Sequence, residues 1–91
     1  MSTQSEFSLH LIFSPDGWHN AKGMIAAQDR VFLLQDAVYL VEQPTLCESE
    51  HLYARALDCL ARDITPAIGC ESIDDDKWLE LAEHAKNILS W

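Results

Sequence analysis

The chain has few basic residues, and this shortage argues against one class of partner. Six lysines and arginines stand against fifteen aspartates and glutamates in 91 residues, which gives a formal net charge of −9. Such a surface repels phosphate backbones, because nucleic-acid binding depends on Lys and Arg neutralising phosphates. We therefore expect no direct binding of nucleic acid. An acidic surface suits a basic partner, but it is more often simply the surface of an acidic cytosolic protein.

Long apolar runs and an export signal are also missing. No apolar run approaches the roughly 18–20 residues of a membrane span. Residues 1–6 lack the basic and apolar regions of a signal peptide, and we expect them to be frayed. Three cysteines without paired spacing do not suggest a disulfide framework. These absences predict a cytoplasmic chain with reduced thiols and no membrane segment.

Familiar catalytic and metal-binding signatures are absent too. The sequence has no glycine-rich phosphate loop, no serine nucleophile elbow and no His-Glu-x-x-His pattern. Cys47 and His51 lie four residues apart, and adding Cys70 and His10 would give four candidate zinc ligands. Cys-x-x-Cys spacing is missing, however, so a loop cysteine and an exposed histidine are the simpler explanation. Residues 74–76 are three aspartates that point in different directions at a helix start. We therefore predict no metal and no cofactor.

The most informative stretch is an apolar run at residues 31–34 (VFLL), bounded by Arg30 and Gln35. The run does not alternate with polar residues, which indicates a strand covered on both faces, as in the centre of a parallel sheet. Gln35 and Asp36 then fall at the carboxyl end of that strand, where α/β sheets place ligands and partner-facing loops. Asp36 can also cap a short helix over residues 37–41 or 37–42, and the two roles are compatible.

Predicted strands and helices alternate along the chain. Strands are expected at residues 7–13, 31–34, 52–57 and, more weakly, 69–73. Helices are expected at residues 18–27 after a turn at 14–17, at 37–42, at 59–63 with Asp58 as cap, and after a Ser72 or Asp74 cap near the end of the chain. A loop or helical turn is expected at 45–50.

The final helix has the clearest amphipathic pattern. Its apolar stripe consists of Trp78, Leu81, Ala82, Ala85, Ile88 and Leu89. Strands alternating with helices predict one α/β domain over residues 1–91, a small three-layer sandwich with a mainly parallel sheet of four to five strands. A chain this short buries only about 60–65% of its extended surface, which favours oligomerisation.

Cys59 is the thiol best placed for chemistry. It follows the third predicted strand and opens a predicted helix, where the helix dipole lowers a thiol pKa and favours thiolate. The alternative is a small buried hydrophobic residue on that helix. The alternative is favoured because no adjacent Lys or His reinforces the thiolate.

Several short motifs follow one another in the order of a known family. They are Leu9-His10, Ser14-Pro15, Leu33-Leu34-Gln35-Asp36 with Val38-Tyr39, Tyr53-Ala54-Arg55-Ala56-Leu57 with Leu60-Ala61-Arg62, Ile73-Asp74 and Trp91. Together they resemble the TusB/DsrH family over most of the chain. The chain departs from the family pattern in its first helix region, which is shorter than usual and has alanine, about Ala21, where some DsrH members have cysteine. A milder departure is Ala37, which stands where the family commonly has glycine after the Gln-Asp pair.

The resemblance implies a DsrE/F/H-like fold and a place in a heterohexameric sulfur-relay complex with sister subunits of the TusC/TusD or DsrE/DsrF type. In the TusB branch that complex passes persulfide sulfur towards 2-thiouridine at the tRNA wobble position. In the DsrH branch it serves dissimilatory sulfur oxidation. The sequence does not separate these branches, and a self-associating binding module with no sulfur role is a further alternative.

The resemblance also leads us to expect a non-catalytic subunit of a sulfurtransferase complex, with the thiol chemistry mainly in another subunit. Sister subunits hold their sulfur-carrying cysteine in broadly the region of Cys59, which keeps this residue as a persulfide candidate. The residues expected at subunit interfaces are Gln35, Asp36, Val38, Tyr39 and Trp91.

Overall fold

The computed structural model describes residues 7–42, 51–66 and 69–91. Its strands are β1 (Ser8–Ile12), β2 (Arg30–Leu33), β3 (His51–Arg55), β4 (Cys70–Ile73) and β5 (Asn87–Ser90). Its helices are α1 (Pro15–Ala21), α2 (Ala56–Ala61), α3 (Asp75–His84) and the two 3-10 helices η1 (Lys22–Met24) and η2 (Gln35–Glu42). All strand pairs are parallel, and the strand order is β4-β3-β2-β1-β5.

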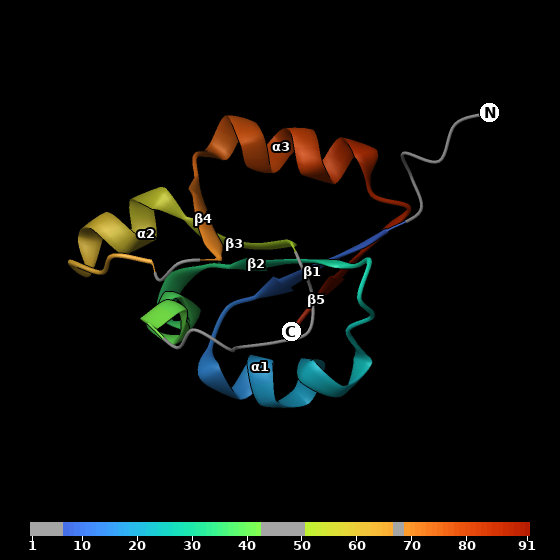
Figure 1. Ribbon diagram of the computed structural model, residues 1–91, viewed down its shortest axis with the longest axis horizontal. Helices are drawn as coiled ribbons and strands as arrows, with labels where there is room; N and C mark the ends of the chain where they lie inside the picture. Colours follow the sequence, from blue (N-terminus) through green and yellow to red (C-terminus); the bar gives the residue numbers. More distant parts are fainter. Residues whose placement is uncertain (1–6, 43–50, 67–68) are drawn as a thin grey trace.

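β2 lies in the middle of this sheet, and both of its faces are covered. Val31, Phe32 and Leu33 are fully buried. Val31 and Leu33 belong to a core with Trp18 of α1, whereas Phe32 packs against Trp78 of α3 on the opposite face. Figure 1 shows α3 over one face of the sheet and α1 under the other. The prediction of a buried central strand is therefore confirmed, but the strand covers residues 30–33 instead of 31–34, and Leu34 is buried just after its end.

The path of the chain explains the strand order. The first four strands are added side by side from β1 to β4, and α3 then carries the chain back across the sheet. β5 consequently pairs with β1, with Leu9 opposite Ile88. The predicted mainly parallel sheet of four to five strands is an all-parallel sheet of five in an α/β fold.

The end of the chain differs most from the sequence prediction. The predicted helical stripe continued through Ile88 to Leu89, but α3 ends at His84 and these two residues lie in β5. Ala85 is extended, with φ −74° and ψ 142°, and the Lys86 N–H donates to the Phe7 carbonyl at 2.9 Å. Pairing with the open edge of β1 therefore overrides the helical spacing of the apolar residues.

Three shorter elements also begin or end at other residues than predicted. The predicted turn at residues 14–17 is the start of α1: the Ser14 hydroxyl accepts a hydrogen bond from Gly17 N at 3.1 Å, and Pro15 is the first helical residue. α1 ends at Ala21 and continues only as η1. β3 ends at Arg55, so α2 begins earlier than predicted. The predicted loop at 45–50 and the frayed residues 1–6 lie outside the described residues.

The cap of α3 agrees with the prediction. The Asp74 side chain accepts a hydrogen bond from Lys77 N at 2.9 Å. This contact satisfies one of the free N–H groups at the start of the helix. Within the described ranges, none of the helices combines the length and the apolar character needed to cross a membrane.

Trp91 is fixed against β1 and α1. The backbone N–H of Trp91 donates to the Leu11 carbonyl at 2.8 Å, and the backbone carbonyl of Trp91 accepts a hydrogen bond from Phe13 N at 3.3 Å. Gly17 lies directly beneath it, and a Cβ on this glycine would come within 2.7 Å of the Trp91 carbonyl oxygen. A glycine is therefore required where α1 and the end of the chain approach each other.

A buried polar pair supports the same corner. The indole Nε1 of Trp91 can only donate, and it donates to His10 Nδ1 at 3.0 Å, which leaves His10 Nε2 to donate to Asp29 at 2.9 Å. Burial raises the pKa of Asp29, but the hydrogen bonds from His10, Ala26 N and Ser8 N outweigh it and hold that pKa below its usual value. The carboxylate thus stays ionised and satisfies donors from both β1 and the turn before β2.

We expect Gly17→Ala to destabilise the fold and Gly23→Ala to leave it nearly unchanged. The added Cβ at Gly17 meets backbone atoms of Trp91, which cannot move aside like a flexible side chain. The free energy of unfolding should fall by about 1–3 kcal/mol, measured by urea denaturation. The matched control meets open space at Gly23 and should stay within about 1 kcal/mol of the original chain. Equal stability of the two variants would contradict the close approach.

Candidate functional site

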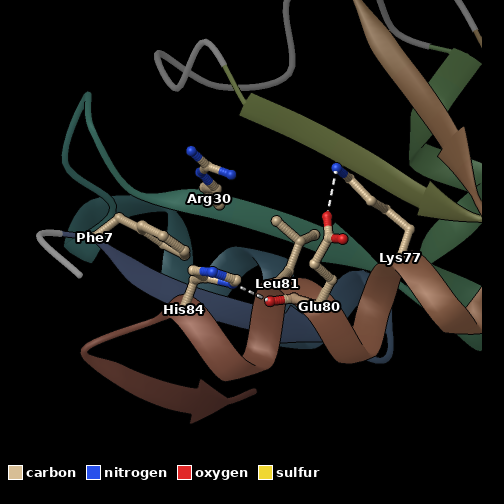
Figure 2. Close-up of a pocket in the computed structure, with 6 residues that line it drawn as sticks. All are labelled: Phe7, Arg30, Lys77, Glu80, Leu81 and His84. Atoms are coloured by element: carbon tan, nitrogen blue, oxygen red, sulfur yellow. Dashed lines mark hydrogen bonds and ion pairs between the residues drawn. The ribbon is translucent and has the colours of Figure 1, made fainter. Parts of the chain in front are cut away.

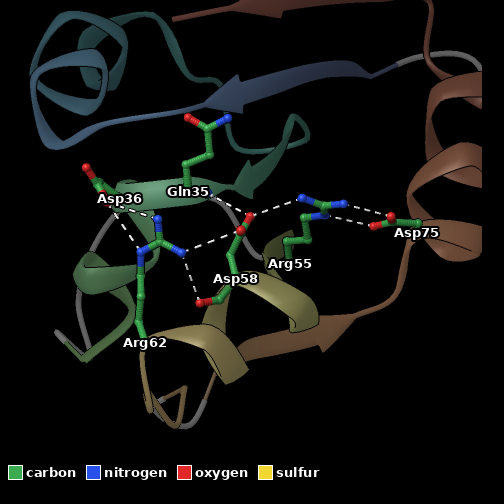
Figure 3. A network of polar contacts seen from close by, with 6 residues as sticks. All are labelled: Gln35, Asp36, Arg55, Asp58, Arg62 and Asp75. Atoms are coloured by element: carbon green, nitrogen blue, oxygen red, sulfur yellow. Dashed lines mark hydrogen bonds and ion pairs between the residues drawn. The ribbon is translucent and has the colours of Figure 1, made fainter.

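The carboxyl ends of β2, β3 and β4 bring polar side chains together. One group follows β2, a second comes from the end of β3 and from α2, and a third begins α3 (Figure 3). We call this group the rim cluster; it consists of Gln35, Asp36, Arg55, Asp58, Arg62 and Asp75. The sequence predicted the two residues after β2 at this position, and the structure confirms where they lie.

Asp58 is the centre of the rim cluster. It is buried, and its Oδ2 accepts a hydrogen bond from Gln35 N at 2.8 Å. Arg55 and Arg62 lie on either side of its carboxylate, each with one nitrogen at 3.5 Å. Asp58 is therefore inside α2, where it fastens the start of η2 to that helix, and the prediction that it caps a helix starting at Cys59 is wrong.

Arg55 links β3 to the start of α3. Its Nε and Nη2 donate to the two oxygens of Asp75, both at 2.8 Å, in the paired geometry that favours guanidinium–carboxylate contacts. The hydrogen bonds from Arg55 to Asp75 lower the pKa of Asp75, and the same bonds raise the pKa of Arg55. The guanidinium also lies 5.7 Å from the ring centre of Trp78. This contact joins the rim to the core under α3.

Asp36 joins η2 to α2. Arg62 donates to Asp36 Oδ1 from Nε at 3.3 Å and from Nη2 at 3.1 Å. Asp36 is the second residue of η2, so the prediction that it caps a helix over residues 37–42 is wrong: the helix begins two residues earlier, at Gln35. Its carboxylate is exposed and is available to solvent on its other side.

Gln35 is held by its backbone and leaves its side chain free. Its φ of 51° lies in the left-handed region, and the hydrogen bond from its N–H to Asp58 secures this conformation. Figure 3 shows the Gln35 amide pointing away from the other rim residues. Among the described residues the amide has no hydrogen-bond partner, and it is exposed. The side chain is therefore presented for contact with another molecule.

The remaining interface candidates occupy different environments. Tyr39 is 51% exposed on η2, as a contact residue requires. Val38 is 0% exposed and packs in the core against α1 and the sheet, so its assignment to a subunit interface is wrong. Trp91 is half-buried against the chain's own core and can offer only part of its surface.

Cys59 lies in the interior, and its surroundings oppose thiolate formation. It is the fourth residue of α2 and is 3% exposed. Burial raises the pKa of the Cys59 thiol, the negative charge of Asp58 raises it further, and Arg62 opposes the rise only partly. Cys70 is half-buried, and Cys47 lies outside the described residues. The environment of Cys59 is that of a packed thiol.

The chemistry of the rim cluster is that of mutually neutralised charges. Three carboxylates and two guanidiniums hold one another, and no neutral base or free nucleophile lies among them. Across the described part of the chain, no group of three or more His, Cys, Asp or Glu residues is arranged to hold a metal ion. The cluster is therefore a set of charged side chains that are paired with one another at the carboxyl edge of the sheet.

The sequence analysis missed the central part of this cluster. Arg55, Asp58 and Arg62 have the i, i+3 and i+7 spacing that places side chains on one helix face, and this spacing was the available signal. Asp75 could not be connected to Arg55 from sequence, because the contact depends on where β3 and β4 end.

The fold and the rim cluster define the class of protein: an α/β domain with an all-parallel sheet and a cluster of polar side chains at its carboxyl edge. No protein-family model and no curated protein matches this chain. Its function is therefore inferred from its own residues and geometry.

We expect Asp58→Ala to lower the free energy of unfolding by about 2 kcal/mol, because it leaves Gln35 N–H unpaired and two arginines without their shared partner. Urea denaturation measures the loss. Asp76→Ala removes an exposed carboxylate from the first turn of α3 and serves as control, with a change below about 1 kcal/mol. A loss in the control as large as in the variant would show that Asp58 is not a special contact.

Cys59 should react slowly with iodoacetamide in the folded chain. Its burial and raised pKa predict alkylation at least about tenfold slower than in urea, where the same thiol is exposed. Peptide mass spectrometry after timed quenching gives both rates for this one residue. Equally rapid labelling of the folded chain would show an accessible thiolate and would revive Cys59 as a sulfur carrier.

Proposed function

We propose that this chain is a non-catalytic, TusB/DsrH-like subunit of a sulfur-relay complex. In that role it binds sister subunits of the TusC/TusD or DsrE/DsrF type and contributes to persulfide transfer for 2-thiolation of the tRNA wobble uridine. The observation that carries this proposal is the apolar surface left exposed on two separate parts of the molecule.

One exposed apolar set lies near the rim cluster, on η2 and α2. It consists of Tyr39, Leu57 and Leu60, which are 51%, 58% and 79% exposed. Single exposed apolar residues are ordinary on protein surfaces, but sets on neighbouring elements are typical of subunit contacts. The free amide of Gln35 and the exposed carboxylate of Asp36 lie on the same edge and would give such a contact its polar rim.

The second exposed apolar set lies on α3 and β5. It consists of Leu79 and Ile88, which are 62% and 47% exposed, whereas Leu89 points to the other face of the sheet. A cavity of about 540 Å³ opens here, and its apolar wall includes Trp78 and Leu11. β5 is also an edge strand, and edge strands present unpaired backbone groups that a partner can cover.

The two sets can meet two different neighbours. α2 follows β3 and contacts β4, whereas β5 lies at the other edge of the sheet. A chain with two apolar surfaces at different ends of its sheet suits a subunit that binds two sister chains. The parallel five-stranded sheet with helices on both faces is also consistent with the three-layer DsrE/F/H-like fold that the sequence resemblance implies.

The proposed role is binding and positioning rather than sulfur transfer by this chain's own thiol. Cys59 is buried with a raised pKa, and this supports placing the persulfide on a sister subunit. The net charge of −9 supports contact with protein partners instead of the tRNA itself. The alternative within the same class is a DsrH-like subunit in dissimilatory sulfur oxidation, which would use the same two surfaces.

Affinity purification from the source cell tests the proposal. The tagged chain should recover sister subunits, and Tyr39→Glu or Leu79→Glu should each weaken recovery at least about tenfold, because a carboxylate is then placed in an apolar contact. Met24→Glu is the matched control, since Met24 is 67% exposed on η1, outside both sets. Circular dichroism checks that each variant folds.

Recovery of the original chain as a lone monomer, with sister subunits present in the same lysate, would count against the proposal. A homodimer in sedimentation experiments, with no sister subunit bound, would instead identify the self-associating module considered from sequence. If the gene for this chain is flanked by genes for sister subunits and also by sulfite-reductase genes, the sulfur-oxidation branch would be favoured.

A further inference from the structure

A small pocket between α3 and the sheet is unusual in this acidic chain because basic residues line it. Its volume is about 220 Å³, and its walls combine three basic side chains with one acidic and two apolar ones (Figure 2). The lining residues are Phe7, Arg30, Lys77, Glu80, Leu81 and His84. The pocket is separate from the rim cluster and from both exposed apolar sets.

Arg30 differs from the other two arginines. Arg55 and Arg62 each hydrogen-bond to carboxylates, as is expected in a chain with fifteen acidic residues. The Arg30 side chain forms no hydrogen bond or ion pair in the described part of the chain, and its Nε is buried without any partner. A buried donor without an acceptor requires an explanation, because nearly all such groups in folded proteins are paired.

The position of Arg30 leaves its charge available. The guanidinium carbon lies 4.3 Å from the ring centre of Phe7, so the aromatic face supports the charged group from one side. A contact of this kind satisfies none of the N–H donors of the guanidinium. An oxyanion is the ligand whose oxygens match the fork of N–H groups.

Lys77 of α3 adds a positive charge and N–H donors to the same pocket, and His84 of α3 forms part of its wall. Lys77 Nζ donates to Glu80 Oε1 at 3.1 Å, which neutralises that carboxylate and leaves other ammonium protons free. His84 Nδ1 donates to the Glu80 carbonyl at 2.8 Å, and this bond fixes the orientation of the imidazole ring. With Arg30 and Lys77 positive and Glu80 negative, the formal charge of the lining is +1 when His84 is neutral.

We infer that this pocket binds a small oxyanion, with Arg30 as its principal ligand and Lys77 as the second. A volume of about 220 Å³ is below the range typical of drug-sized ligands, which suits a compact tetrahedral anion such as sulfate or phosphate. This site does not depend on the proposed sulfur-relay role. The competing explanation is that Arg30 only covers Phe7 and the core beneath it.

Titration followed by NMR separates these explanations. The ¹⁵N-labelled full chain is titrated with sodium sulfate, sodium phosphate or sodium acetate, while sodium chloride keeps the ionic strength constant. We expect saturable shifts of the Arg30 Nε–H signal and of the amides of Phe7 and His84 with sulfate or phosphate. Saturation with acetate as well would support the site and extend its ligands to carboxylates.

Variants assign the binding to this pocket. Arg30→Gln should weaken binding at least about tenfold, and Arg30→Lys should weaken it too because the charge remains but the fork of donors is lost. Lys22→Gln, on the exposed η1, is the matched control and should bind as the original chain does. If Arg30→Gln fails to fold, Arg30→Lys and Lys77→Gln carry the test.

Shifts that grow without saturation, or that sodium chloride alone reproduces, would overturn the inference. Equal affinity in the original chain and in a folded Arg30 variant would overturn it as well. Loss of thermal stability in Arg30→Lys without any sulfate- or phosphate-dependent stabilisation of the original chain would leave Arg30 as a cover for Phe7.

Discussion

The burial of β2 on both faces is the constraint on which the rest of the structure depends. Val31 and Leu33 require one helical layer, and Phe32 requires another. α1 and η2 supply the first layer, and α3 supplies the second by crossing back over the sheet. After β2 the backbone turns directly into η2, and Gln35, the first residue of η2, takes a left-handed conformation that Asp58 stabilises. Core packing thereby determines the geometry of the exposed rim.

The charges of the molecule are distributed in two different ways. At the rim, guanidiniums and carboxylates neutralise one another and tie three segments of the chain together. Under α3, Arg30 keeps its charge without a carboxylate partner. The first arrangement gives a polar surface of paired charges, and the second gives the site that we infer to bind a small oxyanion. An acidic chain can therefore bind anions locally, because the local arrangement of charge matters more than the total.

The sequence predicted the fold where the signal was local. The uninterrupted apolar run at 31–34 identified the central strand, and the Asp74 cap marked the start of α3. The sequence-based prediction failed at Ile88. The apolar residues there have helical spacing, but they form a strand that pairs with the open edge of β1. The resemblance led us to expect Val38 at a subunit interface, whereas this side chain is fully buried in the chain's own core. The contact between Arg55 and Asp75 could not be recognised from sequence, because it depends on where β3 and β4 end in the folded sheet.

The pairing of β1 with β5 has a consequence for how the molecule folds. Strands β1 to β4 are joined through neighbours in sequence, but Trp91 and His10, which hydrogen-bond across this corner, are 81 positions apart. Closing so long a loop carries a larger entropic cost than the preceding steps, and sheets with distant partners form slowly. We therefore regard β5 as the last strand to dock, and a four-stranded intermediate would expose the flank of β1 to association with other chains until it does.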